Sequence, residues 1–302
     1  MQSVIRIVAF EFAGGDAFFL GLALLATGAL VAGWRDGPRI RALFRLATIC
    51  TGIVIAASGT PLPIWFYCVG LVLIGLSLLP RPLTTENSRT YRRFRIVSTL
   101  LAFWCAAAAA WEFSYRLPPR VNGTKRFDTL AVIGDSVSAG LLGPKERTWP
   151  KQFRERYFGS VVDLSREGAT SQSALRQALS LNGRSDNVEP VVLIEIGGND
   201  YFERVAPSEF AAHLDRLLTE LDRPNRQLIM LELPLPPFYN AYGRVQRELA
   251  ATHRVPLISK RQFARVVFTS GATLDTVHLS ESGHSLFADM VWDHVGALLR
   301  SK

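Results

Sequence analysis

Long uncharged segments alternate with arginine-rich ones through the first 117 residues. Residues 17–34 are all uncharged, and as a helix they are long enough to cross a hydrocarbon layer of about 30 Å. The uncharged run 46–80 is too long for one helix, and Pro61 and Pro63 interrupt it. We therefore predict an all-α transmembrane region of about four helices, at 17–34, 43–58, 64–80 and 96–113.

A different pattern begins near residue 128, where short apolar runs alternate with amphipathic stretches. The apolar runs predict five strands, near 130–133, 161–164, 191–196, 227–232 and 255–258. The amphipathic stretches predict helices at 149–157, 171–181, 207–221, 239–252 and 282–299. Strands that alternate with helices form a parallel sheet covered on both faces, with sites at the carboxyl ends of the strands. We therefore predict a five-stranded α/β domain over 128–302, joined to the transmembrane region 1–117 by a polar linker, 118–127.

Composition supports a membrane protein and excludes a disordered one. Of the 302 residues, 48% are hydrophobic and 20% are charged, and the mean hydropathy is +0.16. The net charge of +8 comes mostly from residues 1–117, which hold eleven arginines, no lysine and five acidic residues. Because this excess lies between apolar runs and not on a folded basic face, we expect a lipid bilayer as partner and no nucleic acid.

The arginines also predict an orientation, since positive charge in short loops stays in the cytoplasm. Arginines cluster in segment 35–45 and again in segment 81–95, so both segments should face the cytoplasm. A single kinked helix over 46–80 would give three spans and place 81–95 outside, against the rule. Four spans satisfy the rule and put the α/β domain on the periplasmic side of the cytoplasmic (inner) membrane.

Cysteine usage gives no sign of a disulfide framework or a zinc site. Cys50, Cys68 and Cys105 all lie in predicted transmembrane helices, and residues 118–302 contain no cysteine. Disulfides and zinc ribbons are therefore excluded from the α/β domain, and we predict no metal site.

Glycine-containing turns follow the first three predicted strands. Gly134, Asp135 and Ser136 come directly after the first strand, where a sharp turn exposes a serine hydroxyl beside backbone N–H groups. Gly168 follows the second strand, and Asn199, in Gly197-Gly198-Asn199-Asp200, follows the third. The Asn199 amide is a suitable donor to a developing oxyanion. Taken singly, these motifs also fit a helix N-cap and ordinary turns.

An acid and a histidine stand close together near the end of the chain. Asp275 precedes His278 by three residues, a spacing that can bring the carboxylate to the ring Nδ1–H. Such a pair fixes the imidazole tautomer and leaves Nε2 free to take a proton from a serine. The other four histidines have no comparable partner, and we interpret them as structural.

The chain resembles the SGNH or GDSL hydrolases over roughly residues 128–300. Four motifs occur in the same order in that family: Gly-Asp-Ser after the first strand, a glycine after the second, Gly-Gly-Asn-Asp after the third, and an Asp-x-x-His pair before the last helix. Residues 134–140 (GDSVSAG) and 194–200 (IEIGGND), with Trp149-Pro150 between them, are most similar to the bacterial thioesterase and lysophospholipase branch. The resemblance implies a flavodoxin-like three-layer α/β/α sandwich. The residues after His278, Leu-Ser-Glu-Ser-Gly-His, depart from that branch, which more often has a proline there; this puts the subfamily in doubt and not the catalysis.

The resemblance also implies a role for each site residue. Ser136 would be the nucleophile, His278 the general base and then acid, and Asp275 the residue that orients the imidazole. The oxyanion hole would consist of the Ser136 and Gly168 backbone N–H groups and the Asn199 side chain. Such acyl transfer requires no metal or organic cofactor.

Apolar residues near the predicted site suggest an acyl pocket. They are Leu141 and Leu142 after the nucleophile turn, and Phe238, Tyr239 and Tyr242 after the fourth strand. Core or loop packing explains each of them equally well. We expect a membrane-anchored serine esterase that hydrolyses acyl esters or thioesters, such as lysophospholipids or acylated envelope substrates.

Two other classes of function remain open. A membrane-bound acyltransferase or an O-acetyl esterase acting on cell-envelope glycans would use the same triad. A non-catalytic membrane scaffold with a binding domain is a further alternative. The predicted spans lack interior charges beyond Arg45, which argues against transport, and an intact triad argues against a degenerate domain.

Overall fold

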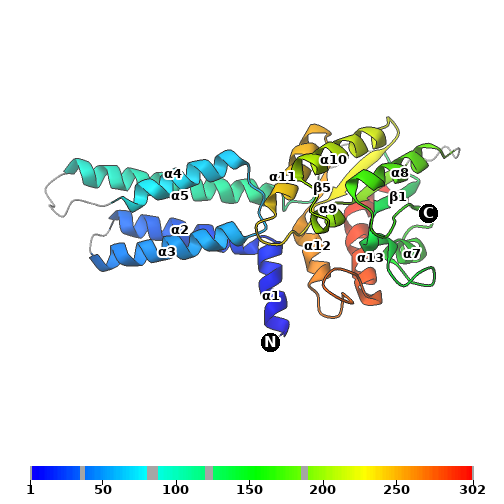
Figure 1. Ribbon diagram of the computed structural model, residues 1–302, viewed down its shortest axis with the longest axis horizontal. Coiled ribbons are helices and arrows are strands. Elements are labelled where there is room, and N and C mark those ends of the chain that lie inside the picture. The colour runs from blue at the N-terminus through cyan, green and yellow to red at the C-terminus, as the bar shows by residue number, and fades with distance from the viewer. Residues whose placement is uncertain (1, 35–37, 80–87, 120–124, 185–189, 301–302) are drawn as a thin grey trace. The chain divides into compact units, whose positions relative to one another are not determined.

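The computed structural model describes the chain except for residues 1, 35–37, 80–87, 120–124, 185–189 and 301–302 (Figure 1). The chain divides into two compact units. The first, here called the α/β unit, comprises Met1–Phe10, Leu117–Leu235 and Ala241–Lys302. The second, the helical unit, comprises Glu11–Arg116 and Pro236–Asn240.

The N-terminal part of the chain is entirely helical where it is described. Its elements are α1 (Gln2–Ala13), α2 (Asp16–Trp34), α3 (Pro38–Ala57), α4 (Ile64–Leu78) and α5 (Ser88–Ser114). The predicted break at the two prolines is confirmed, because α3 ends before them and Ile64 begins α4 directly after Pro63. Helix α1 has no counterpart among the predicted elements.

Small residues allow close packing inside the helical unit. A Cβ on Gly70 of α4 would lie 2.4 Å from the indole ring of Trp104 on α5, so only glycine fits there. The same indole donates a hydrogen bond from Nε1 to the carbonyl oxygen of Phe66 (3.1 Å). Phe18, Leu62 and Leu101 fill the remaining core of the unit.

Helix length supports fewer membrane spans than the sequence pattern predicts. Among the described helices, Arg92–Ser114 alone is long and apolar enough to cross a membrane, with a second if the bent pair Val4–Ala13 and Asp16–Ala32 forms one span. The apolar helices Ala42–Ala57 and Ile64–Leu78 are shorter. At 1.5 Å per residue, the 15 residues of α4 extend only about 22 Å, less than a typical hydrocarbon core. The structure therefore gives one or two candidate spans and weak evidence of a membrane anchor.

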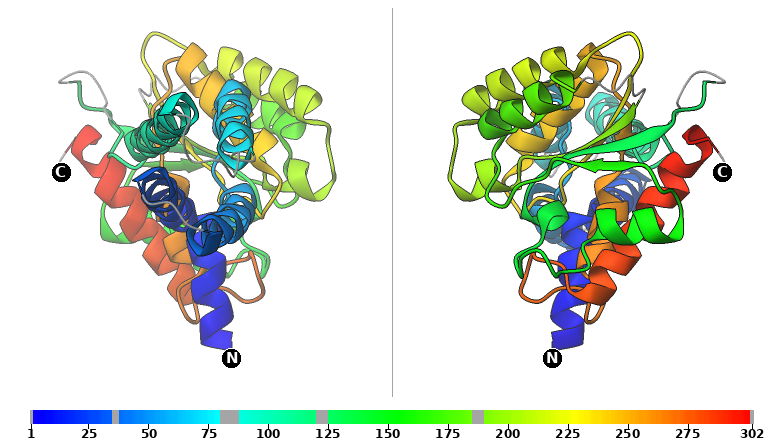
Figure 2. Two further views of the ribbon diagram at one scale, coloured as in Figure 1. Left: turned by 90° about the vertical axis from the view of Figure 1, so that its left-hand side faces the viewer. Right: turned by 90° about the vertical axis from the view of Figure 1, so that its right-hand side faces the viewer.

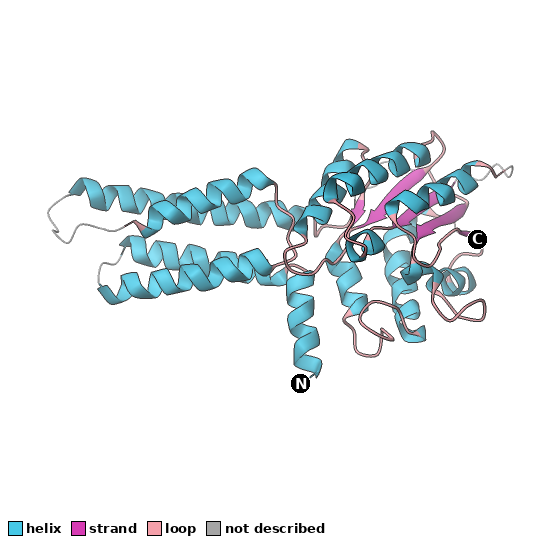
Figure 3. Cartoon of the chain, in the orientation of Figure 1, coloured by secondary structure: helices cyan, strands magenta, loops and turns pink. Residues whose placement is uncertain are grey.

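The α/β unit contains the predicted five-stranded parallel sheet (Figure 3). Its strands are β1 (Thr129–Gly134), β2 (Val161–Asp163), β3 (Pro190–Glu195), β4 (Gln227–Leu231) and β5 (Leu257–Ile258). Their order, β2-β1-β3-β4-β5, is that of flavodoxin-like folds. Every residue of β1 and β3 is buried, as expected for central strands covered on both faces.

Helices cover both faces of the sheet (Figure 2). Helices α8 (Ser171–Asn182), α10 (Pro207–Leu221) and α11 (Asn240–Thr252) lie on one side, and α7 (Trp149–Arg156), α12 (Lys260–Val267) and α13 (Glu281–Val295) on the other. A 3₁₀ turn, η1 (Gly296–Leu298), follows α13. Helix α12 and the short helices α6 (Ser136–Ala139) and α9 (Gly198–Phe202) are absent from the predicted set. The four residues of α6 and the five of α9 are too few to show a helical period.

The loop before α13 packs tightly against the first turn of that helix. A Cβ on Gly283 would lie 1.9 Å from the carbonyl oxygen of Ala272. That same carbonyl accepts the backbone N–H of Ser280 (2.9 Å), and the Ser280 hydroxyl caps α13 at Gly283. The close contact therefore holds the segment that contains Asp275 and His278.

We expect Gly283→Ala to lower the free energy of unfolding by about 1–3 kcal/mol, because the new methyl group must displace backbone. Thermal unfolding measures the effect. Gly183→Ala is the matched control, since its Cβ would meet its nearest atom, the Leu179 carbonyl oxygen, at an ordinary 3.4 Å. Equal unfolding midpoints for the two variants would contradict the prediction.

Candidate functional site

The turn after β1 presents Ser136 at the carboxyl end of the sheet. Asp135 is the N-cap of α6, and its side chain accepts the backbone N–H of Val137 (2.9 Å). Ser136 is the first residue of α6 and is 7% exposed. Gly134 has to be glycine, because a Cβ there would lie 2.7 Å from the Ser138 hydroxyl. The N-cap bond of Asp135 and the close contact between Gly134 and Ser138 thus hold the turn that carries Ser136.

The loop after β2 continues along β1 and leads to Gly168. The Arg166 N–H donates to the Gly134 carbonyl oxygen (3.1 Å), so the loop stays beside the nucleophile turn. Gly168 follows with φ of +68°, in the left-handed region that favours glycine. Among the hydrogen bonds of the described residues, none uses the backbone N–H of Ser136 or Gly168. Both groups therefore remain available as donors to a bound oxygen.

The loop after β3 is tied to the same region. Asn199 donates one amide N–H to the Ala169 carbonyl oxygen (3.0 Å), which leaves the second N–H of the amide. Asp200, fully buried, accepts the backbone N–H (2.8 Å) and the hydroxyl (2.5 Å) of Ser171 at the start of α8. The structure thereby links Asn199 to the loop that carries Gly168.

Asp275 and His278 form the predicted pair. The His278 Nδ1 lies 2.7 Å from the Asp275 carboxylate, whose other oxygen accepts the backbone N–H groups of Val277 and His278. Burial raises the pKa of Asp275, but these hydrogen bonds outweigh it and lower the pKa to about 2. Because Asp275 is an anion at neutral pH, Nδ1 is the donor and Nε2 is free to accept a proton.

His278 also lies near the nucleophile turn. When protonated, its ring would lower the pKa of the carboxyl group of Asp135, the residue directly before Ser136. Three features expected from the sequence therefore come from one region of the α/β unit: the nucleophile turn, the Asn199 loop and the histidine with its acid. Among the described residues, no group of three or more His, Cys, Asp and Glu side chains is placed to hold a metal ion.

The residues of the predicted acyl pocket separate into three groups. Leu141 and Leu142 are exposed, directly after α6. Phe238 and Tyr239 are also exposed, but they belong to the segment Pro236–Asn240 of the helical unit. Tyr242 is 5% exposed in the hydrophobic core, and its hydroxyl donates to the Val205 carbonyl oxygen. Its apolar ring fills the core once that hydroxyl has a partner.

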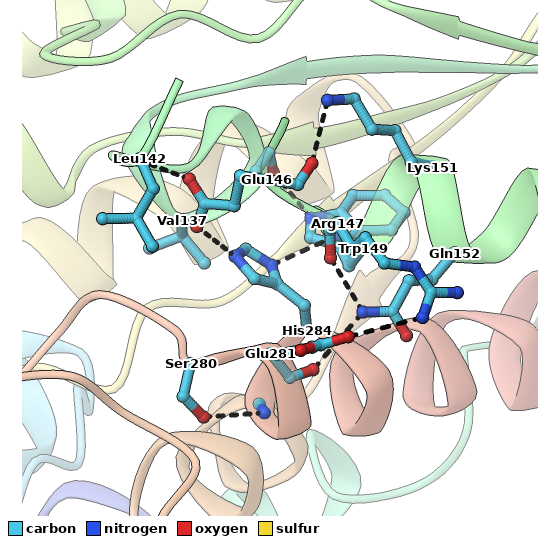
Figure 4. Close-up of polar contacts among 12 residues, drawn as sticks. Val137, Leu142, Glu146, Arg147, Trp149, Lys151, Gln152, Ser280, Glu281 and His284 are labelled. Atoms are coloured by element: carbon cyan, nitrogen blue, oxygen red, sulfur yellow. Dashed lines mark hydrogen bonds and ion pairs between the residues drawn. The ribbon is translucent and has the colours of Figure 1, made fainter. Parts of the chain in front are cut away.

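A polar cluster that sequence reasoning missed holds the loop between α6 and α7 (Figure 4). The ring of buried His284, on α13, accepts the Trp149 backbone N–H at Nδ1 (3.2 Å) and therefore donates from Nε2 to Glu146 (3.1 Å). The other carboxylate oxygen of Glu146 accepts the Leu142 N–H (2.6 Å). Glu146 and His284 thus fasten the loop that carries Leu142 to α13.

Comparison with known families covers the α/β unit. Residues 132–286, a little over half of the chain, match the GDSL-like lipase/acylhydrolase family. The match begins in β1 and ends in α13, so it includes the nucleophile turn, the Asn199 loop and His278.

Two curated proteins are similar over the same part. Thioesterase 1/protease 1/lysophospholipase L1 of Escherichia coli (strain K12) is 30% identical over 138 residues, 43% of this chain and 65% of that protein. Esterase TesA of Pseudomonas aeruginosa is 29% identical over 140 residues, 43% of this chain and 69% of that protein. The chain therefore spans just under two thirds of the E. coli relative's length.

Solved structures resemble the same unit. The crystal structure of TesA has a TM-score of 0.49 and 27% identity, covering 57% of this chain and 99% of that one. The esterase EstA from Pseudoalteromonas sp. has a TM-score of 0.50 and 22% identity, covering 56% of this chain and 97% of that one. The likeness to EstA supports the fold.

The buried His284 predicts an acid-sensitive contribution to stability. Burial lowers the pKa of His284 below its ordinary 6.5, although Glu146 opposes the change. The unfolded chain therefore takes up this proton first, and the free energy of unfolding falls as the pH drops below about 6.5. We expect His284→Gln to lose less stability than the wild type between pH 7 and pH 5, measured by thermal unfolding.

His294→Gln on the same helix is the matched control, since its ring bonds the helix's own Met290 carbonyl oxygen. Subtracting the pH dependence of the wild type's unfolding free energy from that of each variant removes the contribution of other titrating groups. Identical pH dependence in wild type and His284→Gln would contradict the assignment.

Proposed function

The chain belongs to the GDSL-like lipase/acylhydrolase family of carboxylic ester hydrolases, and we propose that Ser136, His278 and Asp275 are its catalytic triad. The observation that carries the proposal is the 2.7 Å hydrogen bond between His278 and Asp275, in a family member whose serine follows β1. The acid holds the ring with Nε2 as acceptor, the state in which it can deprotonate a serine.

The proposed reaction is a two-step acyl transfer. Nε2 of His278 takes the proton of the Ser136 hydroxyl while Oγ attacks the carbonyl carbon of an ester or thioester. The developing oxyanion accepts hydrogen bonds from the N–H groups of Ser136 and Gly168 and from the second N–H of Asn199. The imidazolium then protonates the leaving group, and water activated by the same imidazole hydrolyses the acyl-enzyme.

The substrate class follows from the surroundings of the nucleophile and from the relatives. Leu141 and Leu142 are exposed just after α6 and offer apolar surface to an acyl chain. The E. coli relative is named as a thioesterase and a lysophospholipase. We infer that acyl thioesters and lysophospholipids are substrates, and that the Glu146 and His284 contacts hold the leucine-bearing loop in place.

We further propose that the helical unit anchors the enzyme in the inner membrane. Large apolar side chains such as Leu24, Ile53, Leu71 and Phe103 are exposed on its helices, and lipid would cover them. A topology of four spans with the α/β unit on the periplasmic side would place the arginine-rich segments 35–45 and 81–95 in the cytoplasm, as the distribution of positive charge requires. Bilayer thinning or snorkelling of flanking side chains would accommodate the short apolar helices Ala42–Ala57 and Ile64–Leu78.

Removal of the Asn199 side-chain amide tests its proposed role as an oxyanion donor. We expect Asn199→Ala to lower kcat by about 10²- to 10³-fold, because the transition state loses a preorganised hydrogen bond. Purified protein would be assayed against acyl esters and thioesters of graded chain length. Ser136→Ala should reduce activity to background, and Asn182→Ala, whose amide instead bonds Glu220, should match the wild type. Undiminished turnover by Ser136→Ala would refute the triad.

Topology can be tested with a reporter that is active only in the periplasm, fused after Lys302. We expect reporter activity, and we expect the protein to stay with membranes after alkaline extraction. The same reporter fused within segment 81–95 should be inactive, because that segment is proposed to face the cytoplasm. An inactive C-terminal fusion or release by alkali would contradict the proposed anchor.

A further inference from the structure

A second acid lies buried beneath the nucleophile turn. Glu195, the last residue of β3, is 1% exposed. Its Oε2 accepts the Asp135 backbone N–H (3.3 Å) and the Ser138 hydroxyl (2.9 Å). Its Oε1 is buried and has no hydrogen-bond donor among the described residues. The described ion pairs give Glu195 no cationic partner, so an ionised side chain here would be a poorly compensated buried charge.

Glu195 shares its site with the carboxyl group of Asp135. The backbone N–H of Asp135 donates to Glu195, and each of the two carboxyl groups affects the pKa of the other. Two anions this close in a buried site would repel each other, which favours a proton on one of them. Oε1 of Glu195, the atom without a donor, is the natural place for a hydroxyl hydrogen. Asp135 already uses one oxygen to accept the Val137 N–H at the start of α6, which favours the anionic form of that residue.

The wider network orients Glu195 as well. Trp149 donates from its indole Nε1 to the Ser138 hydroxyl oxygen (3.0 Å), so Ser138 directs its own hydrogen to Glu195. Both acceptor positions on Oε2 are therefore occupied by donors from α6 and the turn before it. The remaining oxygen, Oε1, is buried without a donor among the described residues, and a proton on it would remove the buried charge.

The groups that face Asp135 come from three other elements. They are Glu195 at the end of β3, Asp200 on α9 and His278 before α13. Burial raises the pKa of Asp135 to about 6, and the hydrogen bonds it accepts and nearby His278 oppose the rise. Burial, with Asp135 beside it, raises the pKa of Glu195 well above its ordinary 4.5. Both shifts favour a single negative charge on the pair.

We propose that Glu195 is a positioning residue: as a neutral carboxylic acid, it donates its proton to Asp135 and keeps Asp135 as the anion that caps α6 and faces His278. The inference rests on the proposed roles of Ser136 and His278. When His278 takes the Ser136 proton, the imidazolium has the Asp275 carboxylate on Nδ1 and the Asp135 anion as a second source of stabilisation. The proton between the acids stays in place throughout the reaction.

Paired substitutions test this role through rescue. Glu195→Gln keeps a neutral side chain that donates an N–H to Asp135 and accepts the Ser138 hydroxyl, so we expect it to retain most of the activity. Glu195→Ala removes both bonds and should lower kcat by about 10²-fold, as expected when a nucleophile is misplaced. A Glu195→Gln variant as impaired as Glu195→Ala would overturn the proposal.

Infrared difference spectroscopy reports the protonation state of Glu195 directly, independently of any effect of the substitution on packing. At pH 7 the wild type minus Glu195→Gln spectrum should contain the C=O stretching band of a protonated carboxylic acid. Absence of that band would mean that Glu195 is ionised, and this would overturn the proposal even if Glu195→Ala failed to fold. An active Ser136→Ala variant would instead refute the triad, while the infrared band would still report the shared proton.

Discussion

Buried polar groups at the carboxyl ends of β1 and β3 must find partners inside the protein, and this requirement holds the site together. The side-chain amide of Gln177, on α8, bonds both the N–H and the carbonyl oxygen of Gly134, the last residue of β1. Asp200 satisfies the first turn of α8, and Glu195 accepts from the nucleophile turn. Because an unmade bond in this region costs about 1–3 kcal/mol, each loop is confined to a narrow range of positions.

Rigidity in these loops serves the proposed chemistry. An oxyanion donor is effective only if it is oriented before the charge develops, since reorientation during the reaction would cost free energy. Asn199 is held by the Ala169 carbonyl oxygen, and the His278 ring is held by a carboxylate that is itself fixed by two backbone N–H groups. The exposed leucines after α6 lie on a loop whose carboxylate, Glu146, is anchored to α13. The loop between α6 and α7 therefore carries both the exposed leucines and the carboxylate that anchors it.

The helical unit meets a different constraint. Its core is small, with Phe18, Leu62 and Leu101 buried, while many large apolar side chains face outward. In water such a surface would be unfavourable, whereas in lipid the backbone bonds within each helix are satisfied and the apolar faces are solvated. The outward-facing apolar side chains of the helical unit therefore agree with the proposed membrane anchor.

Local sequence patterns predicted the parallel sheet, the alternation of strands and helices along the chain, and the pairing of Asp275 with His278. These follow from local pattern: fully buried strands are continuous apolar runs, and a three-residue spacing brings an acid to a ring nitrogen within one turn. The buried positions and hydrogen-bond partners of Glu195 and His284, the core position of Tyr242, and the ends of α3 and α4 became apparent only from the tertiary contacts. Those depend on which side chains from distant segments meet in a buried space, and hydrophobic periodicity carries no information about the partner that a buried polar group will find.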